Sequence, residues 1–140
     1  MKPNAAFFIS ILLVFVFAYT GVSKLTDSKG LVAVLRHVPL IARGAGVVAI
    51  LLSLAELLTA LLLIFERTRL IGLRASLLLL VLFTGYLLYM ILFVPHLPCS
   101  CGGVISKMSW RQHLGFNVVL VGLTGIGIRS VRKSVVIDYR

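Results

Sequence analysis

The residues best suited to chemistry are two cysteines that stand one residue apart. Cys99 and Cys101 are the only cysteines of the 140-residue chain, and they lie in the segment PCSCGG at residues 98–103. Two thiols at this spacing can form a disulfide with each other, exchange with the thiols of a partner, or hold a soft metal ion. We therefore expect the reactive chemistry of the chain to be concentrated in this segment.

The spacing favours exchange over a structural disulfide. A bond between Cys99 and Cys101 closes a very small ring, and strained disulfides are the more oxidising and labile ones. A structural disulfide gains most from closing a long loop, and this one closes almost none. Positive neighbours favour the reactive thiolate, which makes His96 and His113 candidates for activating it, with Lys107 nearby.

Two other interpretations of the cysteine pair stay open. Together with Met108 or a histidine, the thiols are a candidate Cu(I) site, because copper in this state prefers soft ligands. A four-thiolate zinc site is excluded by the count of two cysteines. The third interpretation is a reduced, inert pair at a protein contact. We assign no metal ligand.

A single acid, Glu56, lies near the centre of a long apolar run. Ala49, Ser53, Glu56 and Ala60 are spaced four, three and four residues apart, so they share one face of a helix. A charged residue at this depth usually faces other helices, and small neighbours let those helices approach. Glu56 is therefore expected to relay protons or bind a quinone-like ligand, or else to form a structural hydrogen bond.

Several aromatic and polar residues are candidates for the surroundings of Glu56 and the thiols. Tyr86 and Tyr19 are the candidate hydrogen-bond partners of Glu56, and Tyr86 is the deeper of the two. The segment after the cysteines contains Trp110, His113 and Asn117. These residues are three and then four positions apart from one another, which places them on one helical face. We expect Trp110 and Asn117 to shape a pocket beside the thiols.

The composition is that of a membrane protein. The chain is 60% hydrophobic and 13% charged, with a mean hydropathy of +1.11, whereas soluble domains carry about a quarter charged residues. Helices of about 20 apolar residues cross a bilayer, and four such runs are present, at residues 5–22, 46–65, 70–94 and 110–128. The sequence thus predicts an all-α bundle of four transmembrane helices in a single domain covering residues 1–140, with a basic tail at 129–140.

The net charge of +10 does not indicate nucleic-acid binding, because the basic residues stand at the ends of apolar runs, where they anchor helices. Eight of them fall on the side that holds both termini and six on the other, which favours cytoplasmic termini. The first run has a poor signal-peptide cleavage pattern and is interpreted as an uncleaved span. The cysteines then face the outside of the membrane, where disulfides persist.

The first loop contains a short helix pattern. Asp27 and Ser28 are candidate N-caps, and apolar residues follow at helical spacing until Pro39 ends the segment. We expect a short amphipathic helix that either rests on the outer membrane surface or caps the bundle. It acts as a connector or, in the alternative, as a lid over the cysteine segment.

Three stretches of the sequence resemble the MauE/DoxX-type redox-associated membrane proteins. They are YTGVSKL at residues 19–25, LAEL at 54–57, and the CSCGG of residues 99–103 followed by WRQH at 110–113. The resemblance implies a four-helix bundle in the bacterial cytoplasmic membrane that helps an exported, disulfide-rich partner to mature. Its fold is then similar to that of disulfide-forming membrane enzymes of the DsbB and vitamin K epoxide reductase type.

The chain departs from those enzymes in one respect. They use two cysteine pairs, whereas this chain has one, so electrons would pass directly from Cys99 and Cys101 to a quinone or to a second protein. The function that we expect is thiol–disulfide exchange with an exported or thioredoxin-like partner, which is an oxidoreductase activity. The alternative is a non-catalytic membrane subunit or scaffold of a larger complex.

Overall fold

The computed structural model describes residues 5–95 and 109–138, and within these ranges it contains helices and no strand. The elements are α1 (Ala5–Thr26), α2 (Ser28–Leu35), the 3-10 turn η1 (Ala42–Gly44), α3 (Ala45–Ile64), α4 (Arg69–Phe93) and α5 (Trp110–Asp138). Four of the helices, α1, α3, α4 and α5, are long and apolar enough to cross a membrane. The predicted all-α protein with four spans is confirmed.

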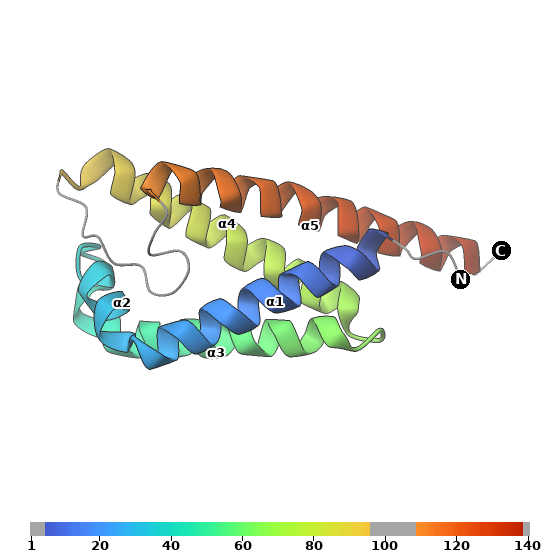
Figure 1. Ribbon diagram of the computed structural model, residues 1–140, viewed down its shortest axis with the longest axis horizontal. Helices are drawn as coiled ribbons and strands as arrows, with labels where there is room; N and C mark the ends of the chain where they lie inside the picture. The colour runs from blue at the N-terminus through green and yellow to red at the C-terminus, as the bar shows by residue number, and fades with distance from the viewer. Residues whose placement is uncertain (1–4, 96–108, 139–140) are drawn as a thin grey trace.

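The four long helices form an antiparallel bundle (Figure 1). Each packs mainly against two others: α1 lies between α3 and α5, and α4 contacts the same two helices from the other side. The first and last helices begin and end at the same end of the bundle, and the short helix α2 lies at the opposite end. We call these the terminus end and the α2 end.

The surface and the interior of the bundle have the polarity expected in a bilayer. Large apolar side chains such as Phe15, Leu78 and Phe93 point outward and are 74%, 62% and 68% exposed. Lipid can cover these side chains at little cost, so the interior is free to hold small and polar residues. The buried polar residues are Ser10, Ser53, Glu56, Thr59, Ser76, Asn117 and Thr124.

The buried hydroxyl groups are satisfied within their own helices. Ser10, Ser76 and Thr124 each donate a hydrogen bond of 2.7–2.8 Å to the carbonyl oxygen four residues earlier. This local bond removes the cost of burying a hydroxyl in an apolar interior. The hydroxyls therefore allow close helix packing without linking one helix to another.

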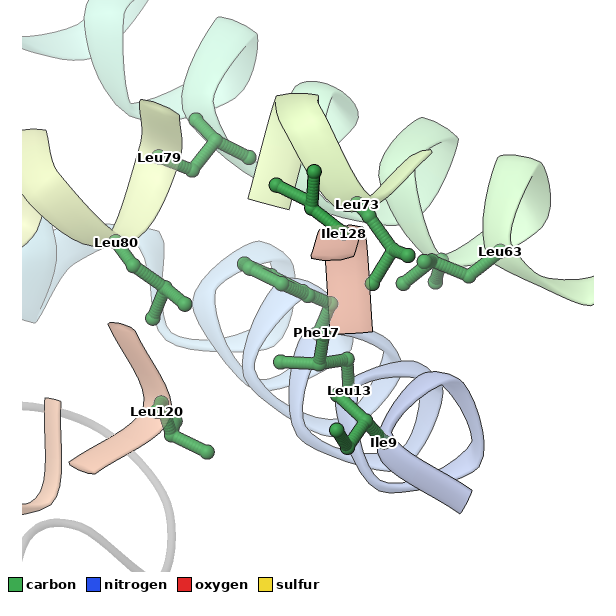
Figure 2. Close-up of a cluster of buried hydrophobic side chains, with 10 residues drawn as sticks. Ile9, Leu13, Phe17, Leu63, Leu73, Leu79, Leu80, Leu120 and Ile128 are labelled. Atoms are coloured by element: carbon green, nitrogen blue, oxygen red, sulfur yellow. The ribbon is translucent and has the colours of Figure 1, made fainter. Parts of the chain in front are cut away.

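The apolar core brings together buried side chains from all four long helices (Figure 2). Leu13, Leu63 and Leu73 come from three different helices and are at most 1% exposed. At the turn between α3 and α4, a Cβ atom on Gly72 would lie 3.0 Å from the backbone nitrogen of Leu63. The two helices therefore approach closely there because position 72 has no side chain.

The short helix α2 caps the bundle instead of lying apart on the membrane surface. Asp27 is its N-cap and accepts a hydrogen bond from the Gly30 backbone N–H at 3.3 Å, while Val34 and Leu35 are 2% and 4% exposed. The helix ends at Leu35, earlier than the expected stop at Pro39. From there the backbone N–H of residues 37 and 38 bonds three residues back, which forms tight turns.

Two long helices extend beyond the apolar runs that predict them. α1 continues to Thr26 instead of stopping at residue 22, and α5 continues to Asp138 through most of the expected basic tail. The length of an apolar run indicates how many residues the bilayer can cover. A helix can be longer, because it continues as long as its backbone hydrogen bonds to the residue four positions earlier persist. The extension of α1 matters most, because it contains Lys24.

Candidate functional site

A cavity of about 390 Å³ lies toward the α2 end of the bundle. All four long helices contribute to its walls, and α2 contributes Leu31, Val34 and Leu35. Most of the lining is apolar, but a few charged and polar side chains converge on it from α1, α3, α4 and α5. An apolar pocket with a few convergent polar groups is the usual form of a ligand site.

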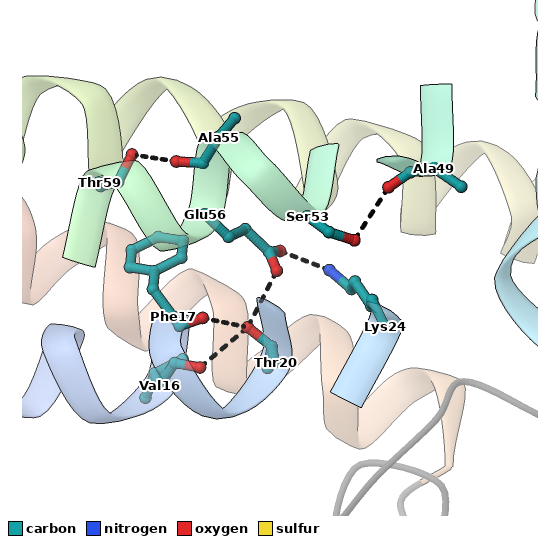
Figure 3. Close-up of polar contacts among 9 residues, drawn as sticks. All are labelled: Val16, Phe17, Thr20, Lys24, Ala49, Ser53, Ala55, Glu56 and Thr59. Atoms are coloured by element: carbon teal, nitrogen blue, oxygen red, sulfur yellow. Dashed lines mark hydrogen bonds and ion pairs between the residues drawn. The ribbon is translucent and has the colours of Figure 1, made fainter. Parts of the chain in front are cut away.

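The strongest interaction in the cavity wall is an ion pair between α1 and α3 (Figure 3). The Nζ atom of Lys24 lies 2.5 Å from Oε1 of Glu56, whose side chain is 1% exposed. The Thr20 hydroxyl lies 3.3 Å from the other carboxylate oxygen and 2.8 Å from the Val16 carbonyl oxygen. Lys24 thus pairs with one oxygen of Glu56, which compensates much of the cost of burying the charge. The single proton of the Thr20 hydroxyl is shared between the other carboxylate oxygen and the Val16 carbonyl oxygen.

Lys24 also reaches a third helix. Its Nζ atom lies 4.1 Å from the centroid of the Phe83 ring on α4, at a distance typical of a cation–π contact. A single ammonium group therefore connects α1 with α3 and α4 at the cavity.

The local sequence of α1 explains how Lys24 is placed. Leu13, Phe17, Thr20 and Lys24 are spaced four, three and four residues apart, so they share the inward face of the helix. On the adjacent position, a Cβ atom on Gly21 would lie 3.0 Å from the Leu57 side chain. The missing side chain lets α1 approach α3 closely enough for Lys24 and Thr20 to reach Glu56.

The wall formed by α5 brings two predicted site residues to the cavity. His113 and Asn117 both line it, and Asn117 is 5% exposed. The helix begins with a capping box: the Ser109 backbone N–H donates to the Gln112 side chain at 3.0 Å, and the Gln112 backbone N–H donates back to the Ser109 hydroxyl at 3.3 Å. These reciprocal bonds define where α5 starts and hence where His113 stands.

The other predicted residues fall into three groups. Tyr86 lines the cavity together with Glu56, whereas Trp110 is half-buried and Tyr19 is 45% exposed, and neither contributes to the lining. His96, Cys99 and Cys101 lie outside the described residues, as do Lys107 and Met108. Within residues 5–95 and 109–138 no group of histidines, cysteines and acids is arranged to hold a metal ion.

The partners of Glu56 were not anticipated. A tyrosine was expected, but the structure pairs the carboxylate with Lys24 and Thr20. Lys24 lies beyond the first apolar run, so its charge belonged to the predicted count of six basic residues on the side opposite the termini. Its helical spacing from Phe17 and Thr20 was the available signal, since a residue on that register shares the inward face of the helix.

Two of the stretches that carry the family resemblance meet at this ion pair. Thr20, Gly21 and Lys24 belong to the YTGVSKL stretch, and Glu56 belongs to LAEL. The WRQH stretch begins α5 and contributes His113 to the same cavity. Segments that are far apart in the sequence thus build one site.

The comparisons with known proteins give one positive result. The sequence model of the family described as methylamine utilisation protein MauE matches residues 2–130. No curated protein and no solved structure matches the chain. The family match covers α1, α3 and α4, and α5 as far as residue 130, and it includes every residue that lines the cavity. The chain therefore belongs to the MauE family.

Proposed function

We propose that this multi-pass membrane protein exchanges disulfides with an exported or thioredoxin-like protein through Cys99 and Cys101. The family membership and the one-residue spacing of the two thiols support the proposal. One structural observation carries it further: α4 ends and α5 begins at the α2 end, where the cavity lies (Figure 1). The chain between these two helix ends contains both cysteines.

The exchange is balanced without any other reagent. A thiolate of the partner attacks one sulfur of the Cys99–Cys101 disulfide, which forms a mixed disulfide and releases the other cysteine as a thiolate. The second partner thiol, after losing its proton, attacks the mixed disulfide, so the partner becomes oxidised and the cysteine pair is reduced by two electrons. The same steps in reverse reduce a partner disulfide.

The start of α5 is suited to assisting this chemistry. A helix N-terminus carries a partial positive charge, and the capping box of Ser109 and Gln112 defines that terminus directly after the cysteine segment. His113 stands one turn further on and lines the cavity. We assign His113 and His96 as the groups that favour the thiolate, and Asn117 and Trp110 as the residues that shape the pocket beside the thiols.

In the proposed orientation the chain spans the inner membrane of a bacterium, with both termini in the cytoplasm and the cysteines outside. The basic residues support it: the count of eight against six becomes eight against five once Lys24 is removed, because its ammonium pairs with Glu56 inside the bundle. Membrane-impermeant maleimide applied to intact bacterial cells tests this assignment. Labelling of the two cysteines only after reduction is expected, and labelling only after lysis would contradict it.

Exchange itself is tested with reduced thioredoxin as a dithiol probe. Membranes that contain the oxidised wild-type chain should oxidise about one thioredoxin per chain, since one disulfide accepts two electrons. The Cys99→Ser/Cys101→Ser variant should oxidise none, and Ser100→Ala serves as the matched control because it keeps both thiols. Equal oxidation by the double serine variant would contradict the proposal and favour the non-catalytic subunit.

A further inference from the structure

At the terminus end, one guanidinium group is largely buried without a full partner. Arg69 is the first residue of α4, and its side chain is 16% exposed. Its Nη2 atom lies 4.0 Å from Oε1 of Glu66, which is too far for a hydrogen bond, and the Glu66 side chain is 80% exposed. Within residues 5–95 and 109–138, the buried Nε atom of Arg69 has no hydrogen-bond partner. The charge of Arg69 has thus lost much of its water with little compensation from the described chain.

The neighbouring helix α1 fixes the position of this charge. The Cζ atom of Arg69 lies 5.7 Å from the centroid of the Phe7 ring, within the range of a cation–π contact. Such a contact holds the guanidinium in place but supplies no oxygen acceptor to its N–H groups. The group is therefore positioned and still able to donate to an anion.

The N-terminus of α4 adds to the positive charge at this place. The N-cap residue Thr68 does not cap the helix with its side chain, because its hydroxyl donates to the Leu62 carbonyl oxygen at 2.8 Å, in the last turn of α3. The first turn of α4 also contains no acidic residue. A helix N-terminus carries a partial positive charge and attracts anions. Here that charge stands directly beside the guanidinium of Arg69.

The charges and donors around Arg69 favour a phosphate group. Arg67 precedes it in the turn between α3 and α4, and Arg74 follows it on α4, whereas Glu66 is the acid of that turn. Positive charges thus outnumber negative ones locally. Phosphate oxygens match the fork of an arginine, which can bind them through two parallel hydrogen bonds.

The place of Arg69 in the bundle indicates that the phosphate belongs to a lipid. It begins a helix that is long and apolar enough to cross a membrane, so it lies where the apolar interior of a bilayer meets the headgroups. Ile64, Phe65 and Ile71 stand near it in the sequence, and all three are exposed. They offer an apolar surface to acyl chains beside the charge, from which a soluble phosphate would gain nothing.

We propose that Arg69 and the start of α4 bind the phosphate of an anionic phospholipid, of the phosphatidylglycerol class. The Nη groups of Arg69 donate to the phosphate oxygens, and the first turn of α4 adds its partial charge. A choline headgroup is disfavoured, because its own cation would face Arg67 and Arg69. The cavity lies toward the opposite end of the bundle, so the Cys99→Ser/Cys101→Ser variant should bind the lipid as the wild type does.

Native mass spectrometry of the full chain in detergent tests the lipid preference. Phosphatidylglycerol and phosphatidylcholine with identical acyl chains are added in equal amounts, so that only the headgroups differ. The wild type should retain one phosphatidylglycerol about tenfold more than phosphatidylcholine. Equal retention of the two lipids would overturn the proposal. Glycerol 3-phosphate at the same concentration should displace neither lipid, and displacement would show a site for soluble phosphate and overturn the lipid assignment.

Two arginine variants separate this site from a general effect of charge. Arg69→Gln and Arg132→Gln each remove one positive charge, and Arg132 is exposed near the end of α5. Arg69→Gln should lower the preference for phosphatidylglycerol about tenfold. Arg132→Gln should lower it by less than about twofold, since an exposed charge is screened. Equal losses in the two variants would show that net charge alone attracts the lipid and overturn the proposal.

A measurement on the wild-type chain keeps the proposal testable if Arg69→Gln does not fold. A phosphatidylglycerol with a diazirine on its headgroup is placed in nanodiscs with the full chain, illuminated, and mapped by mass spectrometry. Cross-links are expected on Phe7 and on residues 66–71 at the start of α4. Cross-links confined to the exposed Arg129 and Arg132 of α5, or to the α2 end, would overturn the proposal.

Discussion

The two ends of the bundle are built from the same four helices but differ in packing and polarity. At the terminus end, α3 and α4 meet at a tight turn, and leucines and isoleucines from all four helices fill the interior (Figures 1 and 2). At the α2 end, the same interior contains a cavity and an ion pair. Close packing at one end can therefore hold the four helices together while the interior at the other end keeps a cavity.

The largest expected effect concerns the ion pair. Lys24→Met should lower the free energy of unfolding by about 3–5 kcal/mol, because removing one member of a buried pair leaves the other without compensation. Lys24→Met combined with Glu56→Gln should cost less than Lys24→Met alone, since no buried charge then remains. Unfolding of the purified protein by detergent, analysed as a double-mutant cycle, measures the difference. Additive costs would show that the pair is not coupled.

A matched pair of leucines on α4 compares the packing of the two ends. Leu73 is 0% exposed in the packed core, and Leu87 is 2% exposed but lines the cavity. Leu73→Ala should destabilise by at least about 2 kcal/mol, and Leu87→Ala by clearly less, because a side chain beside a void has fewer contacts to lose. Detergent unfolding of both variants is the measurement, and equal costs would mean that the α2 end is packed as tightly as the other.

The smallest expected effect tests the close approach at the terminus end. Gly72→Ala should destabilise by about 1–3 kcal/mol, because its Cβ atom would meet the Leu63 backbone at 3.0 Å and force the helices apart. Gly85→Ala on the same helix is the control. No atom lies within 4 Å of its Cβ position, so alanine should stabilise the helix by up to about 1 kcal/mol. Thermal unfolding that changes equally in both variants would refute the distinction.

Much of the fold was predictable because it depends on local patterns. Apolar runs predict the four membrane-spanning helices, since a bilayer requires about 20 apolar residues in sequence. Asp27 and the residues after it predict α2, because capping and helical spacing are local. The inward face of α3 was also predictable: Ala49, Ser53 and Glu56 are all buried, as their spacing indicates.

The partners across the bundle were beyond sequence reasoning. Whether Glu56 meets Tyr86 or Lys24 depends on the rotation and depth of two helices relative to each other, which no single helix specifies. The close approach of α1 to α3 at Gly21 helps to set the rotation and depth of these two helices relative to each other. Lys24, which lies outside the apolar run, thereby becomes an interior residue. Its long side chain is what allows this, because it can extend from the helix end toward the centre.

The sequence by itself determined the four spans, the short cap α2 and the inward direction of Glu56, since each follows from the spacing of neighbouring residues along one helix. Only the tertiary structure decided that Lys24 is the counter-ion and that His113 and Asn117 share a cavity with it. The physical reason is that a cavity is the space left between helices. Its position depends on where their side chains fail to meet, and that is a property of the assembled bundle.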